Sequence, residues 1–337
     1  MPLPAPRGPL SCAVVSALTG DAVGLDRLRD RAAADLPTGK DFLLDEDIAI
    51  TMTMLYELHL RGIVGVSDDW EWNADLLATR AVLEGRFLEA VDDLVGMVER
   101  PDDLEEALWA VGNADDGPPL ASFMARTAEC DHFRELIVHR SFHQLREADV
   151  HTMAIPRLHG AAKAGLVEVQ MDEYGGGFIE RMHATLYARM MRALGLNSAY
   201  AHYIDVIPAS TLAGVNALSL FGVHRSLRYE LIGHLCAVEM TSALPSRKYS
   251  RGLARLGFGA DARLFFDEHV EADSVHEQLV VREVAGRLAA EDPTAGASLI
   301  RGARACAAFD ALAAEHVWHC WESSETSLLR PLEGVTS

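Results

Sequence analysis

Helical periodicity is the feature that most constrains the fold of this chain. Between glycine and proline breaks, hydrophobic residues recur with a spacing close to 3.6, and almost no segment alternates with a period of two. Pro156 and the run "NADDGPPL" stand where helices are expected to begin or end. The sequence therefore predicts an all-α protein, with helices over residues 43–63, 74–98, 102–112, 121–150, 157–173, 178–194, 209–224, 228–243, 247–256, 261–290 and 297–321.

The run "NADDGPPL" is also the best candidate for an internal boundary, because almost all clustering of His, Glu and Asp follows it. The first twenty residues contain recurring proline and no lysine, so we interpret them as a leader and not as an export signal. Four regions are predicted: a leader at 1–40 that is poorly ordered or forms a short helix, an N-terminal helical layer at 41–118, a helical bundle at 119–325 and a tail at 326–337.

Composition excludes several classes of partner. Asp and Glu number 50 against 30 Lys and Arg, so the formal net charge of −20 would repel nucleic acids and anionic membranes. The five cysteines form no CxxC spacing, which argues against both a disulfide framework and a thiolate metal site. No apolar run reaches the roughly 18 residues of a transmembrane helix. We expect a cytoplasmic protein that binds neither nucleic acid nor membrane.

Metal-binding residue types recur at helical spacing in "HVEADSVH". His269, Asp273 and His276 are four and then three residues apart, so on a helix their side chains share one face. A second acid-x-x-His pair, Glu180 and His183, occurs in "ERMH". Two such pairs are stronger evidence for a metal site than one.

Each acid-x-x-His pair has a glutamate on an earlier predicted helix. Glu147 lies 33 residues before Glu180, and Glu239 lies 34 residues before Asp273. Helical bundles use this pattern to place carboxylates and imidazoles from four helices around two metal ions. Carboxylate and imidazole ligands suit redox iron or manganese better than metals that prefer thiolates.

Two features go beyond what a ferritin-type site requires. His269 stands one turn before Asp273, and Glu173 lies at a predicted helix end beside three glycines. The additional imidazole and carboxylate favour an asymmetric, O2-activating dimetal centre over iron storage. Glu239 stands in the apolar stretch "LIGHLCAVEMTSAL", where a carboxylate without a cation or hydrogen-bond partner would be strongly destabilised.

Several stretches together resemble the bacterial iron-containing redox enzymes of the haem-oxygenase-like diiron oxidase and oxygenase superfamily. They include "YELHLRG", "DDWEWNADLLATRA", "LREADVHTMAIPRLHGAAKAGLVEVQMDEYGGG", "RMHATLYARMMRALGL", "GHLCAVEMTSALP" and "FFDEHVEADSVHEQ". The resemblance runs from about residue 40 to residue 320. It implies a seven-helix haem-oxygenase-like bundle that binds no haem and carries an N-terminal helical extension.

The resemblance also implies a ligand set at the matching positions. In some members, notably N-oxygenases, a glutamate precedes the first ligand histidine by ten residues, and this chain has Glu173 there, with Asp172 and Glu168 as nearby alternatives. Glu180 then lies outside the set, whereas a ferritin-like site would use it. The set of metal ligands is Glu147, Glu173, His183, Glu239, His269, Asp273 and His276.

In that superfamily two irons bound as Fe(II) react with O2 to give a peroxo-diferric species, and most substrates are small amines, amino acids or fatty acids. The resemblance therefore implies a non-haem diiron oxygenase or oxidase that acts on an amino acid or amine in natural-product biosynthesis. N-oxygenation is the first choice, and desaturation, cyclisation or C–C cleavage of an amino acid is the alternative. A homodimer and an external electron donor are expected. A ferritin-like iron-handling protein and a metal-free helical protein are the competing interpretations.

Overall fold

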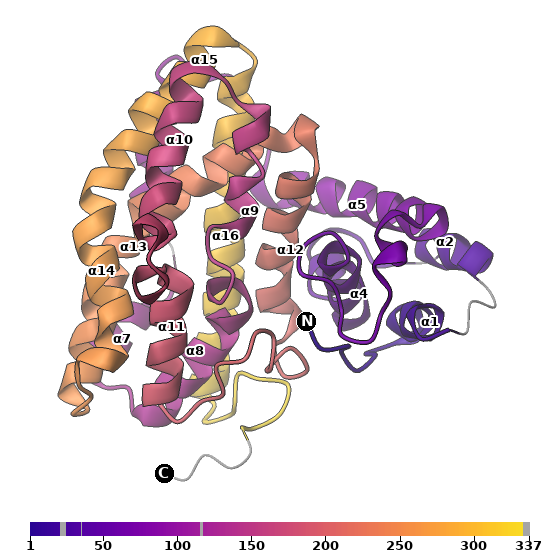
Figure 1. Ribbon diagram of the computed structural model, residues 1–337, viewed down its shortest axis with the longest axis horizontal. Helices are drawn as coiled ribbons and strands as arrows, with labels where there is room; N and C mark the ends of the chain where they lie inside the picture. Colours follow the sequence, from indigo (N-terminus) through magenta and orange to yellow (C-terminus); the bar gives the residue numbers. More distant parts are fainter. Residues whose placement is uncertain (21–24, 35, 115–116, 333–337) are drawn as a thin grey trace.

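The computed structural model describes residues 1–20, 25–34, 36–114 and 117–332, except for the side chains of 25–27 and 271–275. Every regular element within these ranges is a helix, which confirms the predicted all-α class. None of the described helices is long and apolar enough to cross a membrane. Figure 1 shows a tall bundle with a smaller group of N-terminal helices beside it.

The N-terminal layer packs on the bundle where α4 contacts α12 (Ala209–Val223). Its members are α1 (Pro9–Leu18), α2 (Leu25–Ala33), α3 (Gly39–Leu43), α4 (Glu46–Glu57), the 3-10 helix η1 (Asp68–Trp72) and α5 (Ala74–Val95). Where the sequence predicts a leader, the structure has α1 and α2, and α1 buries Leu10, Val14 and Leu18. Residues 21–24 and 35 of the predicted leader lie outside the described part of the chain.

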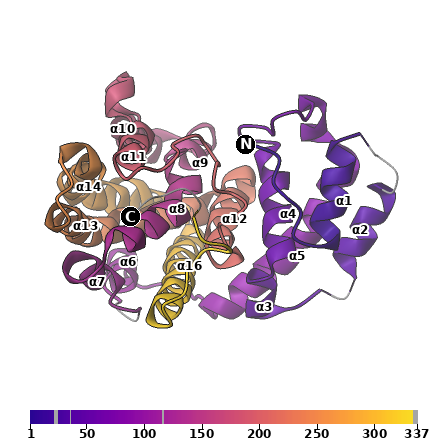
Figure 2. The same cartoon turned by 90° about the horizontal axis from the view of Figure 1, so that it is seen from below.

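The bundle is organised around a long central helix, α13, which contacts α7, α14 and α16. Figure 2 shows α12 and α16 standing between the N-terminal layer and the pair α13 and α14. The helices α6 (Leu104–Gly112), α7 (Leu120–Arg126), α8 (Cys130–Gln144), α9 (Asp149–Thr152), α10 (Gly160–Glu173) and α11 (His183–Ala193) precede α12. After it come α13 (Arg228–Arg255), α14 (Ala260–Gln278), the π-helix η6 (Leu279–Gly286), α15 (Arg287–Glu291) and α16 (Ala295–Glu322).

Four short 3-10 turns connect the bundle helices: η2 (Ile155–Arg157), η3 (Gly175–Gly177), η4 (Ile179–Arg181) and η5 (Arg225–Leu227). Helix α6, in the sequence region assigned to the N-terminal layer, contacts α13, α16 and η6 of the bundle. The tail predicted at 326–337 is described as far as residue 332, and Ser327 and Leu328 in it are buried. The predicted domain boundaries stay predictions.

Two helix predictions differ from the structure for identifiable reasons. The helix predicted over 121–150 is divided into α7, α8 and α9. It is interrupted between Arg126 and Cys130, and again after Gln144, where the chain turns at Ala148, which has a left-handed φ of 72°. The two helices predicted over 228–243 and 247–256 form the single helix α13, which continues through Pro245. Packing of α13 against α7, α14 and α16 outweighs the roughly 3 kcal/mol that a proline costs inside a helix.

Helices α13 and α16 approach closely because a glycine on each faces the backbone of the other. A Cβ atom at Gly233 of α13 would overlap the carbonyl oxygen of Leu299, and one at Gly302 of α16 would overlap that of Glu230. Protein interiors are packed too densely to absorb such an atom without displacement. This seam therefore fixes the position of α13, the central helix of the bundle.

Replacing Gly233 with alanine should lower the free energy of unfolding by about 1–3 kcal/mol or more, because the two helices must move apart. The matched control is Gly85→Ala in α5, where an added Cβ meets nothing within 4 Å. That change should leave stability unchanged or raise it by roughly 0.5–1 kcal/mol. Urea unfolding of both variants measures the difference, and equal stabilities would contradict the close seam.

Candidate metal centre

Six of the seven predicted ligands form two adjacent groups in the bundle. Within each group one ligand atom from each residue lies within 4.8 Å of the others: Glu147, His183 and His269 in the first group, and Glu173, Glu239 and His276 in the second. The groups adjoin, because His183 Nδ1 lies 2.9 Å from Glu173 Oε2. The seventh predicted ligand, Asp273, belongs to α14, and its side chain lies outside the described residues.

Helix α14 contributes one histidine to each group. His269 and His276 are seven residues apart, which is about two helical turns, so both rings project from one face. Helix α13 contributes Glu239 from near its middle. The glutamate of α10 and the histidine of α11 stand at helix ends instead, where Glu173 is the last residue of α10 and His183 the first of α11.

A left-handed residue shapes the segment that carries Glu147. The chain leaves α8 at Gln144 and enters α9 at Asp149, and Ala148 between them is buried with a φ of 72°. This conformation costs a residue other than glycine roughly 1–2 kcal/mol. The carbonyl of Ala148 accepts a hydrogen bond from Gln170 Nε2 at 3.4 Å. Backbone strain of this kind concentrates at functional sites, and here it directly follows a predicted ligand.

Three consecutive glycines bring Glu173 and His183 together. Gly175, Gly176 and Gly177 have φ values of 63°, 62° and 85°, a conformation that side chains rarely adopt. A Cβ at Gly175 would also lie 2.6 Å from the Arg181 carbonyl carbon, so the turn folds tightly on itself. The close approach places the end of α10 beside the start of α11.

Buried polar atoms without a hydrogen-bond partner occur in both groups. They are Glu147 Oε2, His183 Nδ1 and His276 Nδ1, each of which faces a charged neighbour within 4 Å but makes no well-directed hydrogen bond. Buried polar atoms normally have a partner, and a pair of bound cations, one in each group, would satisfy all three. Carboxylate and imidazole donors suit first-row metals such as iron. The residues present therefore fit a pair of metal ions.

Hydrogen bonds determine which ring nitrogen of each α14 histidine faces the centre. His269 Nδ1 donates to the Phe265 carbonyl at 2.7 Å, which leaves Nε2 as the ligand atom. His276 Nε2 donates to Asp172 Oδ2 at 2.9 Å, which leaves Nδ1. Outer partners of this kind orient metal-binding histidines in many proteins. Sequence reasoning treated Asp172 only as a substitute for Glu173, whereas the structure shows that it contacts His276.

Neighbouring carboxylates favour protons on two imidazoles of the groups. Burial opposes the charge of His276, but Glu239 and Asp172 beside it raise its pKa to about 9. Burial likewise opposes protonation of His183, and the adjacent Glu173 carboxylate raises its pKa nevertheless. Metal binding must displace these protons, because only a deprotonated ring nitrogen can be a ligand.

The imidazoles around Glu147 favour the ionised form of its carboxylate. Burial alone would raise its pKa, but the His269 and His183 imidazoles beside it lower the pKa below its usual value. His269 Nε2 lies 3.5 Å and His183 Nδ1 3.8 Å from the Glu147 carboxylate. The first group is therefore an anion held between two imidazoles, an arrangement that a cation can enter.

Other polar residues of interest lie outside the two groups. Glu180 is exposed, so the carboxylate that a ferritin-like site would need is absent from both groups.

His151 Nε2 and His234 Nδ1 lie 3.2 Å apart in the interior. Burial lowers the pKa of His234 to about 3 and that of His151 well below its usual value. Both imidazoles are therefore neutral.

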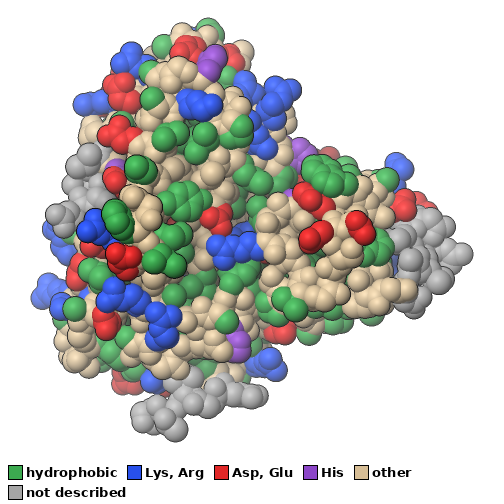
Figure 3. Space-filling model, viewed as in Figure 1, with side chains coloured by type: hydrophobic (Ala, Val, Ile, Leu, Met, Phe, Trp, Pro, Cys, Tyr) green, Lys and Arg blue, Asp and Glu red, His purple; other side chains and the backbone are tan. Residues whose placement is uncertain are grey.

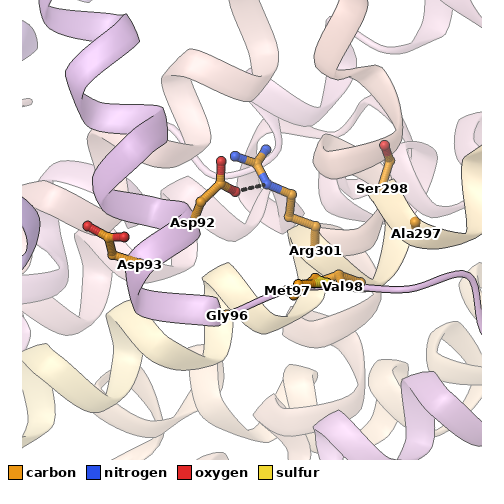
Figure 4. A pocket seen from close by; sticks show the side chains of 8 residues that line it. All are labelled: Asp92, Asp93, Gly96, Met97, Val98, Ala297, Ser298 and Arg301. Atoms are coloured by element: carbon orange, nitrogen blue, oxygen red, sulfur yellow. Dashed lines mark hydrogen bonds and ion pairs between the residues drawn. The ribbon is translucent and has the colours of Figure 1, made fainter.

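The surface around the bundle has two notable features. A hollow of about 450 Å³ lies between the end of α5 and the start of α16, where Arg301 donates to Asp92 at 2.7 Å (Figure 4). No predicted ligand lines it.

On the face seen in Figure 3, hydrophobic side chains are exposed on α10 and in the turn after Glu173. Those side chains are Val167, Met171, Phe178 and Ile179.

Part of the chain matches a known protein family. The sequence model of a family described as iron-containing redox enzymes matches residues 134–311, a stretch that includes both groups. Nitrosourea synthase from Streptomyces achromogenes subsp. streptozoticus is 24% identical over 180 residues. The alignment covers 53% of this chain and 38% of that protein, so the chain spans about two fifths of the length of its relative.

The glycine turn yields a test of the local geometry. Gly175→Ala should separate Glu173 from His183, because the new Cβ adds a collision with the Arg181 backbone to an unfavourable φ. Gly176→Ala is the matched control, since its φ is nearly the same and its Cβ would be 3.9 Å from the nearest atom. Thermal unfolding should show the Gly175 variant to be less stable by about 1–3 kcal/mol. Equal stabilities would contradict the close approach.

Metal binding should strengthen as the pH rises toward 9. The proton on His276, whose pKa is about 9, must leave before Nδ1 can bind a metal. For the ion bound by the group that contains His276, this is one displaced proton, so its apparent affinity should rise roughly tenfold per pH unit below that value. Titration with Co(II) between about pH 6 and 8, followed by visible absorption, measures this slope. Asp172→Asn removes an anion that holds the proton and should shift the dependence to lower pH, whereas an affinity independent of pH would contradict the assignment.

Proposed function

The chain belongs to the family of iron-containing redox enzymes and is an oxidoreductase, and we propose that it is an O2-dependent oxygenase or oxidase with two irons. The two groups described above would hold one iron each, with Asp273 as a further predicted ligand. The observation that supports this proposal best is the 2.9 Å contact between Glu173 and His183, which joins the groups into one centre. Ions in two-metal sites are about 3.5–4 Å apart, which requires ligand groups that adjoin in this way.

An iron pair held there would supply the electrons that O2 reduction requires. The residues of the chain position and enclose it. Phe265 packs against His269 with ring centroids 4.3 Å apart and against Tyr187 at 4.8 Å, and all three side chains are buried. These rings exclude water from one side of the first group. Glu147, Glu173 and Glu239 bring negative charge that offsets the charge of bound cations.

The proposed substrate is a small amino acid or amine, and the proposed reaction is N-oxygenation in natural-product biosynthesis. Two observations support this choice: the similarity to nitrosourea synthase, and the presence of Glu173 in the second group, where the sequence resemblance to N-oxygenases implies a ligand. Desaturation, cyclisation or C–C cleavage of an amino acid is the second candidate, because the same centre could remove hydrogen from carbon.

Two partners belong to the proposal. Inserting one oxygen atom of O2 into a substrate and reducing the other to water takes two electrons that the substrate does not provide. An external electron donor would therefore restore the reduced irons after each turnover. A homodimer is proposed from the family resemblance alone, and light scattering would test it by giving the mass of the protein in solution.

The test is to load the protein anaerobically with two equivalents of Fe(II) and add O2 with a panel of amino acids and amines. Mass spectrometry separates the outcomes, since a gain of one oxygen indicates oxygenation and a loss of two hydrogens indicates desaturation or ring closure. Glu239→Gln should lower turnover by at least about 100-fold, because even outer partners of metal ligands contribute 10- to 100-fold.

Glu230→Gln is the matched control, because Glu230 is a buried glutamate of the same helix that belongs to neither group. Its turnover should equal that of the unmodified protein. Iron analysis tests the ferritin-like alternative, since an oxygenase binds about two irons per chain and a storage protein binds many. Full O2-dependent turnover by the Glu239 variant would refute the proposed centre.

A further inference from the structure

Two ion pairs connect the N-terminal layer to the chain segment that runs from the end of α8 to the first residue of α9. Glu57, the last residue of α4, accepts from Arg146 Nη1 at 2.6 Å. Arg61 Nη2, just after α4, donates to Asp149 Oδ2 at 2.9 Å. Both contacts join parts of the chain that are almost ninety residues apart, since the separations are 89 and 88.

The first pair is almost completely buried. The exposed fractions of the side chains are 2% for Arg146 and 1% for Glu57. Tyr200 donates a second hydrogen bond to Glu57 at 3.0 Å, and Arg146 Nη2 donates to Ser219 at 3.2 Å. A buried ion pair holds a narrow geometry, because each charge has lost its water and depends on its partner. Arg146 directly precedes Glu147, so this geometry extends to a proposed metal ligand.

The second ion pair is linked by hydrogen bonds to the group that contains Glu173. Asp149 accepts from Arg61 on one oxygen and from the Tyr174 hydroxyl on the other, at 3.0 Å. The Tyr174 hydroxyl also lies 3.0 Å from Thr152 Oγ1. Tyr174 directly follows Glu173, so a chain of hydrogen bonds runs from the N-terminal layer to the end of α10.

Glu147 and Glu173 are the ligands that most need such support. Each lies beside an irregular segment, the left-handed residue after Glu147 and the three glycines after Glu173. By contrast, Glu239, His269 and His276 project from within long helices whose own hydrogen bonds fix them.

We propose that Glu57 and Arg61 are positioning residues of the metal centre. Glu57 holds the carboxylate of the first group through Arg146, and Arg61 holds that of the second group through Asp149 and Tyr174. The N-terminal layer therefore helps to position the proposed ligands Glu147 and Glu173. It does so although Glu57 and Arg61 precede the region that matches the family. This inference rests on the proposed metal-binding function and adds to it.

Co(II) binding to the full chain, followed by calorimetry and visible absorption, tests the proposal without catalysis. Arg61→Ala and Tyr174→Phe should each weaken the binding of one of the two ions by roughly fivefold, the upper limit for a half-exposed ion pair. Arg61→Lys keeps the positive charge and should restore most of the affinity. The matched control is Tyr229→Phe, which removes a similar hydrogen bond, at 2.9 Å to Asp292. It should leave both affinities unchanged.

Glu57→Gln tests the buried pair and should weaken binding of an ion by at least about tenfold, since the charge of Arg146 then lacks its partner. If that variant does not fold, Tyr200→Phe removes one hydrogen bond to Glu57 more gently and takes its place. Wild-type affinities in the Arg61, Tyr174 and Glu57 or Tyr200 variants would overturn the inference and leave the proposed function intact. Failure of the unmodified chain to bind any Co(II) or Fe(II) would overturn both.

Discussion

The rest of this structure depends on the burial of carboxylates and imidazoles at one place in a helical bundle. Each such group loses hydration on folding, and partial pairing, as between Glu147 and His269, recovers only part of that loss. Glu147 Oε2 lies 3.8 Å from His183 and His276 Nδ1 lies 3.5 Å from Glu239, and neither atom makes a hydrogen bond, so the pairing is incomplete. The close packing of α13 against α16 and several buried polar contacts hold these side chains in the interior, although burial costs them their hydration.

Hydrophobic periodicity predicted which segments are helical but not where a helix is interrupted or continues. It identified the helices that carry Glu239 and His276, because their apolar positions recur at helical spacing over many turns. It missed the interruption at Ala148, since the pattern continues through it and alanine gives no sign of a left-handed conformation. It also divided α13 at Pro245, because the contacts that keep the helix continuous come from helices distant in the sequence.

The residues of the two groups could be predicted from sequence, whereas their supports could not. Spacing and family resemblance identified the residues that the structure brings together in two groups, because acid-x-x-His pairs on helices have a readable signature. Asp172 contacts His276 across 104 residues, and Glu57 contacts Arg146 across 89. No local pattern relates such partners, since their contact depends on how the helices pack. The "YELH" stretch is part of the family resemblance, but nothing in it indicates that its glutamate pairs with an arginine beside a predicted ligand.

The π-helix η6 begins three residues after His276, at the end of the helix that supplies both histidines. A π-helical turn accommodates one more residue than an α-helical turn, as a single insertion during evolution would require. Such an insertion leaves the histidine face upstream undisturbed and rotates everything downstream relative to it. Because η6 packs against α10, a single residue gained or lost there would reshape that end of the bundle without moving the face of α14 that carries His269 and His276.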